Sequence, residues 1–388
     1  METTRRARRG PSARVRRRRR LFAVTGIAIF AIAAVVVITL AVPRFVTASA
    51  SNPEGSSEAA PSASPTADPE YVPSTEAQRL LAEAQDPRAC AVTFVGDGVT
   101  TAPVLEIQDT LYAHLPIPAR DGLVFAGWYT SPADAAAFNI GARINGADAV
   151  ACTDNQITLN AAWKTPEENA AEDAKIPILM YHQFTTNPDG ESGWLRGNYA
   201  YIGDFDAQMN HIATTGFYLP TWQELSAFVD GRLFLPNHSV IVTDDDADQS
   251  WFDLAAPIVG KYKLLTTSFM ITAYRQDPPP NIYVLRRSHT NDMHQAGDNG
   301  KGRMVNWSAD QIAADLEQSA AVLGVKEVIA YPFGHYNDTA KQGVTQAGFE
   351  MARTIEPGYV AIGTDKLALP VVRINYGMGL TDLINEIG

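Results

Sequence analysis

The chain has 388 residues, 46% of them apolar and 19% charged, and its formal net charge at pH 7 is −12. This length exceeds one average domain, and the apolar content suffices for more than one buried core. The acidic balance argues against a nucleic-acid partner, because binding to phosphates depends on clustered Lys and Arg side chains.

The N-terminus combines a basic block with an apolar run. Residues 1–20 carry ten arginines and one acid, and residues 21–43 contain no charged side chain. Because about 20 apolar helical residues span a bilayer core, we expect a single transmembrane helix over 21–43. The positive-inside rule then makes 1–20 a cytoplasmic tail of a single-pass membrane protein whose remaining domains are extracellular. The alternative is a cleaved signal peptide, since Ala48-Ser49-Ala50 resembles a cleavage site.

A linker and a small β domain follow. Residues 44–84 are rich in Ser, Ala, Pro and Glu and bury too little apolar surface to fold, apart from a short helix expected over 75–84. Residues 85–165 contain strand-like runs punctuated by Gly, Pro and Asp. These runs are residues 91–95, 123–125 and 157–163.

Cys90 and Cys152 are the only two cysteines, and both lie in the small β domain. An extracellular location permits a disulfide. We therefore expect a bond that staples this domain rather than a reactive thiol, because no histidine or acidic motif adjoins either cysteine.

Beyond a polar helical connector, residues 175–388 alternate between apolar strands and helices. Expected strands cover 176–182, 218–219, 239–242, 267–271 and 328–331, and expected helices cover 205–215, 222–229, 257–262 and 308–323. Ser308 and Gln311 form a capping box that marks one helix start. Such alternation indicates parallel strands with helical crossovers, and hence an α/β domain.

Three adjacent carboxylates, Asp244, Asp245 and Asp246, follow directly on the apolar run 239–243. They are predicted at the C-terminal end of a buried strand, where sites in parallel α/β folds gather. Adjacent carboxylates repel one another unless a cation offsets the charge or some of them point into solvent. Alone, the cluster fits a catalytic metal site, a Mg²⁺ site for phosphoryl transfer or a solvated loop.

His289 and His294 favour the first interpretation. Five residues apart, they would lie on different faces of a helix, so they can share a ligand only from a turn. Mg²⁺ prefers oxygen ligands, whereas Zn²⁺ readily takes paired imidazoles. Two imidazoles and one carboxylate can hold a divalent ion and leave a position open for water, as hydrolytic zinc sites require.

Three segments share their residues and spacing with the motifs of a known family. Thr-Asp-Asp-Asp-Ala at 243–247 is similar to its Thr-Phe-Asp-Asp-Gly motif, His289 and His294 to its second motif, and Tyr-Pro-Phe-Gly at 331–334 to its third. From about 175 to 388 the chain resembles polysaccharide deacetylases of the NodB-homology type, carbohydrate esterase family 4. It is most similar to the poly-N-acetylglucosamine deacetylase branch. The resemblance implies an α/β fold, an irregular (β/α) barrel.

The resemblance also implies roles for the matched residues. Asp245 would be the general base. The ligands of a divalent metal, most suitably Zn²⁺, would be Asp246, His289 and His294. The substrate-binding lining would consist of Tyr331, Pro332, Phe333 and Gly334. His182 follows the opening strand and would lie near the site, as a catalytic residue or as a buried structural histidine. The reaction implied is metal-assisted hydrolysis of an acetamide, in which Asp245 takes a proton from water.

The chain departs from the family pattern where the leaving-group acid is expected. In the family a histidine near the C-terminus protonates the amine, but no histidine follows His335, and 369–377 reads Leu-Pro-Val-Val-Arg-Ile-Asn-Tyr-Gly. General acid catalysis contributes about 10² to 10⁴ in rate, or roughly 3 to 5 kcal/mol of barrier. The enzyme would therefore be slow unless His182 or Asp245 substitutes.

Two further departures lie in the first motif. Asp244 replaces the family's Phe, and an extra carboxylate is expected to raise the pKa of the neighbouring base. Ala247 replaces Gly and is expected to restrict the turn that follows the strand.

The small β domain carries a second resemblance. Residues 115–129, ending in Gly-Trp-Tyr, and 159–163, ending in Ala-Ala-Trp, resemble the bacterial surface repeat of the internalin B type. This implies a small β-grasp-like unit that serves as a spacer or binding module. Trp128 and Trp163 are expected to be core aromatics, with sugar stacking as the alternative.

Together these inferences predict a membrane-anchored deacetylase acting on an N-acetylglucosamine-containing cell-wall or biofilm glycan. Its expected partners are the acetylated polysaccharide and the membrane. Two alternatives remain: a catalytically degenerate surface protein that binds glycan, and an O-acetyl esterase that uses the same site.

Overall fold

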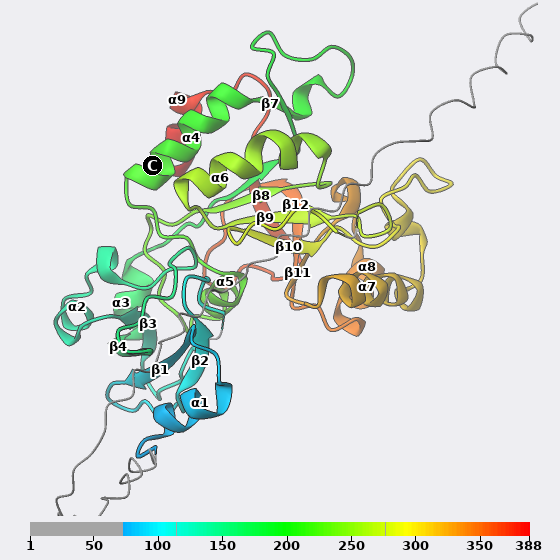
Figure 1. Ribbon diagram of the computed structural model, residues 1–388. Helices are drawn as coiled ribbons and strands as arrows, with labels where there is room; N and C mark the ends of the chain where they lie inside the picture. The colour runs from blue at the N-terminus through cyan, green and yellow to red at the C-terminus, as the bar shows by residue number, and fades with distance from the viewer. Residues whose placement is uncertain (1–72, 114, 276) are drawn as a thin grey trace, which may run out of the picture. The chain divides into compact units, whose positions relative to one another are not determined.

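The computed structural model describes residues 73–113, 115–275 and 277–388, which belong to one compact unit (Figure 1). The predicted basic tail, the predicted transmembrane helix and most of the predicted linker fall within 1–72 and lie outside these residues. Among the residues described, no helix combines the length and apolar character needed to cross a bilayer. The domain boundaries given above stay predictions.

The N-terminal part of the described chain is a four-stranded mixed sheet. Its elements are α1 (Glu76–Ala84), β1 (Ala89–Val95), β2 (Val104–Ile107), β3 (Val124–Tyr129), α2 (Pro132–Ala137), β4 (Gln156–Lys164) and α3 (Pro166–Ala171). The strand order is β2-β1-β4-β3, with a parallel central pair and antiparallel outer strands. The predicted β-grasp-like character and the resemblance to internalin B-type repeats stay predictions.

A disulfide and an aromatic cluster hold this sheet together. Cys90, fully buried on β1, is joined to Cys152 across 62 positions. The rings of Phe94 and Phe125 lie 4.7 and 5.0 Å from the Trp128 ring, and the Trp128 indole N–H donates to a backbone carbonyl at 2.8 Å. Trp128 is thus a core aromatic, as predicted.

The C-terminal part of the described chain contains a closed barrel of seven parallel strands. These are β5 (Ile178–Tyr181), β8 (Ile241–Asp244), β9 (Thr266–Met270), β10 (Val284–Ser288), β11 (Val328–Ala330), β12 (Met351–Pro357) and β13 (Leu369–Arg373). They follow one another in the order β10-β11-β12-β13-β5-β8-β9, and each neighbouring pair is parallel. The predicted α/β class is confirmed.

Helices connect several of the barrel strands. They are α4 (Ile202–Thr214), α5 (Trp222–Val229), α6 (Ala256–Tyr262), α7 (Ala309–Leu323), α8 (Asp338–Gln346) and α9 (Leu380–Ile387), and two short paired strands, β6 (Gln183–Thr185) and β7 (Tyr199–Tyr201), lie after β5. Figure 1 shows α7 and α8 side by side, and α4 packs with α6 and α9. The predicted capping box of Ser308 and Gln311 starts α7.

Two predicted strands differ from the structure. Residues 218–219 make only an isolated bridge. The strand expected at 239–242 lies at Ile241–Asp244, because its ladder with β5 extends to the pair Tyr181 and Asp244. Asp244 is therefore the last strand residue, and the carboxylates after it belong to the following turn.

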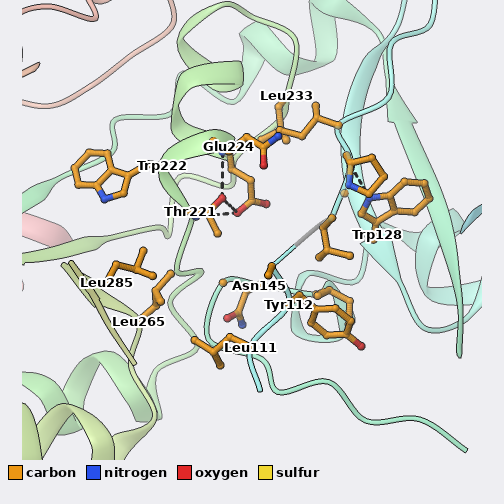
Figure 2. A pocket seen from close by; sticks show the side chains of 18 of the residues that line it. Leu111, Tyr112, Trp128, Asn145, Thr221, Trp222, Glu224, Leu233, Leu265 and Leu285 are labelled. Atoms are coloured by element: carbon orange, nitrogen blue, oxygen red, sulfur yellow. Dashed lines mark hydrogen bonds between the residues drawn. The ribbon is translucent and has the colours of Figure 1, made fainter. Parts of the chain in front are cut away.

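The small sheet packs against the barrel end at which the strands begin. A cavity of about 270 Å³ lies there among Trp128 of β3, Trp222 of α5, Leu265 and Leu285 (Figure 2). Leu265 immediately precedes β9, and Leu285 is the second residue of β10. The cavity thus lies at the opposite end of the strands from Asp244, so the sheet leaves the C-terminal barrel mouth uncovered.

Candidate metal centre

The three predicted metal ligands converge at the C-terminal ends of the barrel strands. Asp246 follows β8, and His289 and His294 lie on the loop that follows β10. The Nε2 atoms of His289 and His294 are 3.4 and 3.3 Å from the same oxygen, Oδ1 of Asp246. One ligand atom of each residue lies within 4.8 Å of the others. The turn between the histidines does bring both imidazoles to one point.

Hydrogen bonding at this cluster leaves the ligand atoms available. His289 Nδ1 lies 2.9 Å from the carbonyl oxygen of Ala330, so Nδ1 carries the proton and donates it while Nε2 presents its lone pair to Asp246. Within the described part of the chain, Asp246 Oδ1 is buried and has no hydrogen-bond partner. Two imidazole nitrogens and a carboxylate oxygen suit Zn²⁺ better than Mg²⁺. These residues therefore fit a zinc-type ion.

Burial and neighbouring charges set the protonation of the ligands. Burial, and then His289, lower the pKa of His294 to about 4, so this imidazole is neutral at pH 7. Burial raises the pKa of Asp246, but His289 and His294 outweigh it and hold the pKa below its usual value. Burial lowers the pKa of His289, whereas Asp246 and Asp245 raise it, with a net rise. His294 and Asp246 already have the protonation states that bind a cation.

The loops of all three motifs contain left-handed backbone at non-glycine residues. The φ angle is +71° at Asp246 and +50° at Ala247, +69° at Thr290 and +57° at Phe333. Such conformations cost on the order of 1 to 3 kcal/mol each and persist where the surrounding structure determines them. The expected restriction at Ala247 is thus a left-handed turn that this alanine adopts despite its Cβ.

The candidate base, Asp245, pairs with a buried arginine. Nη2 of Arg353 on β12 donates to Asp245 Oδ1, and both side chains are almost fully buried. The other arm of the guanidinium donates from Nη1 to the Thr354 carbonyl oxygen at 2.9 Å, and the group lies 5.1 Å from the Phe269 ring. The arginine is therefore fixed, and it fixes the carboxylate in turn.

This ion pair reverses the effect expected of Asp244. Burial raises the pKa of Asp245, but Arg353 and then His182 outweigh burial, so the pKa of Asp245 lies below its usual value. Burial, and then Asp245, raise the pKa of Asp244 well above its usual value. The expectation that the pKa of the base would be raised is wrong, because the charge of Arg353 lowers it. Asp244 Oδ2 accepts a hydrogen bond from Ser268 at 3.0 Å.

His182 lies beside the base. It follows β5, and its Nε2 is 3.7 Å from Asp245 Oδ2. Its Nδ1 is buried and has no hydrogen-bond partner among the described residues. Burial lowers the pKa of His182 against the opposing effects of Asp245 and Asp246. An imidazole that adjoins both a base and a cavity can transfer a proton to a leaving group.

These groups line a cavity of about 340 Å³ at the barrel mouth. Tyr331, Phe333 and Gly334 also line it, as predicted, whereas Pro332 is buried and does not. Pro332 is displaced because it begins a 3₁₀ turn in which Phe333 takes up the left-handed conformation. Phe333 is 41% exposed, and its ring lies 4.1 Å from that of His294, so it offers an apolar face beside the ligands.

Three further residues complete the site without belonging to any motif. Arg353 contacts Asp245 across 108 positions, Arg373 ends β13 on the cavity wall, and Trp194 is 92% exposed at the same cavity. The only sequence signal for Arg353 is its position as the one charged residue in the run Met351–Ile355. Arg373 falls in the segment 369–377, where the family pattern predicts a late histidine.

The chain is similar to known polysaccharide deacetylases. Residues 235–352 match the family model described as polysaccharide deacetylase. The poly-beta-1,6-N-acetyl-D-glucosamine N-deacetylase of Staphylococcus aureus (strain MRSA252) is 27% identical over 161 residues, which cover 36% of this chain and 56% of that protein. YxkH of Bacillus subtilis (strain 168), named as a polysaccharide deacetylase, is 24% identical over 231 residues, 56% of this chain and 76% of that protein.

Among solved structures, the Streptococcus pyogenes deacetylase PplD in complex with acetate is 22% identical with a TM-score of 0.48, covering 56% of this chain and 99% of that chain. The match to the Staphylococcus aureus relative spans about half of that relative's length. The family match at 235–352 includes Asp245, Asp246, His289, His294 and the Tyr-Pro-Phe-Gly segment. The similarity to polysaccharide deacetylases thus covers the residues that converge at the barrel mouth.

Proposed function

We propose that this protein is a metal-dependent hydrolase that removes N-acetyl groups from an N-acetylglucosamine-containing glycan outside the cytoplasm. One observation carries the proposal: the Asp246 carboxylate lies between two imidazoles, and a second carboxylate of low pKa, Asp245, adjoins it in one cavity. A cation site beside a base is the arrangement that amide hydrolysis requires. The similarity to deacetylases of N-acetylated glycans supports this substrate class.

Asp246, His289 and His294 would hold the ion, and Zn²⁺ matches their donor atoms best. When bound, the ion would polarise the acetyl carbonyl and lower the pKa of water in the cavity. The chain contributes a fixed ligand geometry, because the Ala330 carbonyl accepts the Nδ1 proton of His289 and so orients its Nε2.

Asp245 is the general base. Its low pKa keeps the carboxylate ionised at neutral pH. Arg353 engages Oδ1, which leaves Oδ2 to accept a proton from water. Oδ2 is also the oxygen that faces His182 at 3.7 Å, so the base and the second proton carrier adjoin each other.

His182 is the acid that protonates the leaving amine nitrogen. It borders the cavity and retains a buried Nδ1 with no partner in the described structure. This role compensates for the missing late histidine, which was the main support for a catalytically degenerate glycan-binding protein. We therefore favour the enzyme over that alternative.

The chain's organisation supports a place at the cell surface. The apolar run at 21–43 would anchor the protein, and the Cys90–Cys152 disulfide is compatible with an oxidising compartment outside the cytoplasm. The small β domain, with its resemblance to internalin B-type repeats, would act as a spacer or binding module. It packs at the barrel end away from the site, which keeps the mouth open to a polymer.

Acetate release from N-acetylglucosamine oligomers by the purified, zinc-loaded protein tests the proposal. We expect Asp246→Ala to lose both the metal and acetate release, and Asp245→Asn to keep the metal while losing about 10²- to 10⁴-fold in rate. Asp121→Asn, at an exposed turn before β3, is the matched control and should behave as wild type.

Two results would contradict the proposal. One is a wild-type protein that binds no Zn²⁺, Co²⁺ or Ni²⁺, and the other is unchanged acetate release by Asp246→Ala. Glycan binding without release from any substrate would support the degenerate alternative, and release from acetylated xylan alone would support the O-acetyl esterase.

A further inference from the structure

Arg373 places a positive charge without an acidic partner on the wall of the candidate active site. It is the last residue of β13 and lines the same cavity as Asp245 and Asp246. Its Nη2 donates to Asn198 Oδ1 at 2.7 Å, and its Nε donates to Asn375 Oδ1 at 3.1 Å. Both partners are neutral amides, and no carboxylate of the described residues forms an ion pair with it.

The contrast with Arg353 shows what is unusual here. Arg353 is fully buried and forms an ion pair with Asp245, whereas Arg373 is only partly buried and forms no ion pair with a described residue. A guanidinium has five N–H donors, and the two amide contacts of Arg373 occupy one on Nε and one on Nη2. The remaining donors form part of a fork held in a fixed plane, which is the geometry that binds carboxylates.

The strand order places Arg373 beside the proton donor. β13 pairs with β5, which His182 follows, and β5 separates β13 from β8 and its ligand Asp246. The charge of Arg373 also contributes to the low pKa of His182, in keeping with their proximity. Since His182 serves the leaving amine, Arg373 lies on the sugar side of the scissile amide and away from the acetyl side.

The rim next to Arg373 is suited to hold a sugar. Asn198, the Arg373 partner, ends the loop between β6 and β7. Tyr376 holds this loop in place, because its backbone N–H donates to the Gly197 carbonyl at 3.1 Å and its hydroxyl to the Pro188 carbonyl at 3.0 Å. Trp194 on the same loop is 92% exposed. A tethered loop thus presents a free aromatic face at the cavity.

Resting on the proposed function, we infer that Arg373 binds a carboxylate carried by the sugar that loses its acetyl group, or by the adjoining sugar. The substrate class is then an acidic N-acetylated glycan, with a lactyl ether or a uronic acid next to the acetamide, in preference to a neutral N-acetylglucosamine homopolymer. Trp194 contacts the sugar ring irrespective of charge, and Arg373 selects for the charge.

Methyl esterification removes the charge of such a substrate with little change in its shape. We would measure kcat/KM for acetate release by the full-length zinc-loaded protein on a lactyl-bearing oligosaccharide, a uronate-bearing one, the methyl ester of each, and a neutral N-acetylglucosamine oligomer of equal length. For wild type we expect kcat/KM to be about 10- to 100-fold higher for an acid than for its ester, the range for hydrogen bonds to a charged group. Which acid shows the preference identifies the source of the carboxylate.

Three variants isolate the effect. Arg373→Gln should reduce the acid-to-ester ratio to about 1, chiefly through KM, and Arg373→Lys should keep part of the ratio because it keeps the charge but not the fork. Trp194→Ala is the matched control on the same rim. It should lower kcat/KM for acids and esters by the same factor and leave the ratio at its wild-type value.

The inference is overturned if wild type treats acids and esters alike, or if Arg373→Gln lowers both equally, which would make Arg373 a tether for the loop that carries Trp194. It is also overturned if Arg373→Gln alters inhibition by acetate but not the ratio, because Arg373 would then hold the product. If no substrate releases acetate, the proposed function fails, but calorimetric affinities for acid and ester still decide this inference. Tighter binding of the acid than of its ester by wild type, lost in Arg373→Gln, supports the inference. Equal affinities of wild type for acid and ester overturn it.

Discussion

Arg353 and Asp245 form an ion pair in which the two side chains are 0% and 4% exposed. The pair joins β12 to the turn after β8, 108 positions apart in the chain. Its charges neutralise each other away from solvent, so removing one of them leaves the other buried and uncompensated. The pair therefore links the stability of the barrel to the ionisation of the candidate base.

Replacing Arg353 tests this link. We expect Arg353→Met to lower the free energy of unfolding by about 3 to 5 kcal/mol and to reduce acetate release, because loss of the Arg353 charge would raise the pKa of Asp245. Urea unfolding at pH 7 measures the first effect. The double variant Arg353→Met/Asp245→Asn removes both charges and should recover most of the stability, though not the activity. A single variant as stable as wild type would contradict the account.

His182 gives a prediction about pH. Its pKa is below its usual value because it is buried, so the protonated fraction falls as the pH rises through values below about 6.5. If His182 is the acid, kcat/KM should fall along this alkaline limb, and His182→Gln should abolish the limb and lower kcat about 10²- to 10⁴-fold with metal content unchanged. His238→Gln, at an exposed histidine, is the control. An unchanged limb in His182→Gln would exclude the role.

His294 should titrate far below an ordinary histidine in the metal-free protein. Its pKa is lowered to about 4, against roughly 6.5 in the unfolded chain. Between these values the unfolded state binds more protons, so the contribution of His294 makes stability fall as the pH decreases from 6.5 towards 4. NMR of the imidazole shifts measures the midpoint, with the protein in urea as reference. A midpoint near 6.5 in the folded protein would show that the ring is not buried as described.

The left-handed turn at Ala247 predicts opposite outcomes for two Ala→Gly changes. At Ala247, where φ is +50°, glycine relieves a strain of about 1 to 2 kcal/mol but adds freedom to the unfolded chain, so stability should stay level or rise by up to about 1 kcal/mol. At Ala256, where φ is −57° at the start of α6, the same change should cost about 0.5 to 1 kcal/mol. Thermal unfolding compares them. If Ala247→Gly lowers the stability as much as Ala256→Gly does, the proposed strain at Ala247 is contradicted.

The cluster of candidate metal ligands could be predicted from the sequence because each residue follows a parallel strand, and the ends of such strands meet at one barrel mouth. Arg353 and Arg373 could not be predicted in this way. Their partners, Asp245 and Asn198, are 108 and 175 positions away, and only the closure of the barrel brings them together. The prediction that Pro332 lines the cavity was wrong for a local reason. A motif match does not reveal which residues of a strained turn point into the cavity.

Zinc titration of the metal-free protein, with acetate release followed at each step, tests the central claim most directly. We predict that release from an N-acetylated glycan rises with bound metal and saturates at about one ion per chain, because Asp246, His289 and His294 form one ligand cluster. Asp246→Ala should neither bind the ion nor release acetate. Acetate release by the metal-free protein, or by Asp246→Ala at the wild-type rate, would contradict the account.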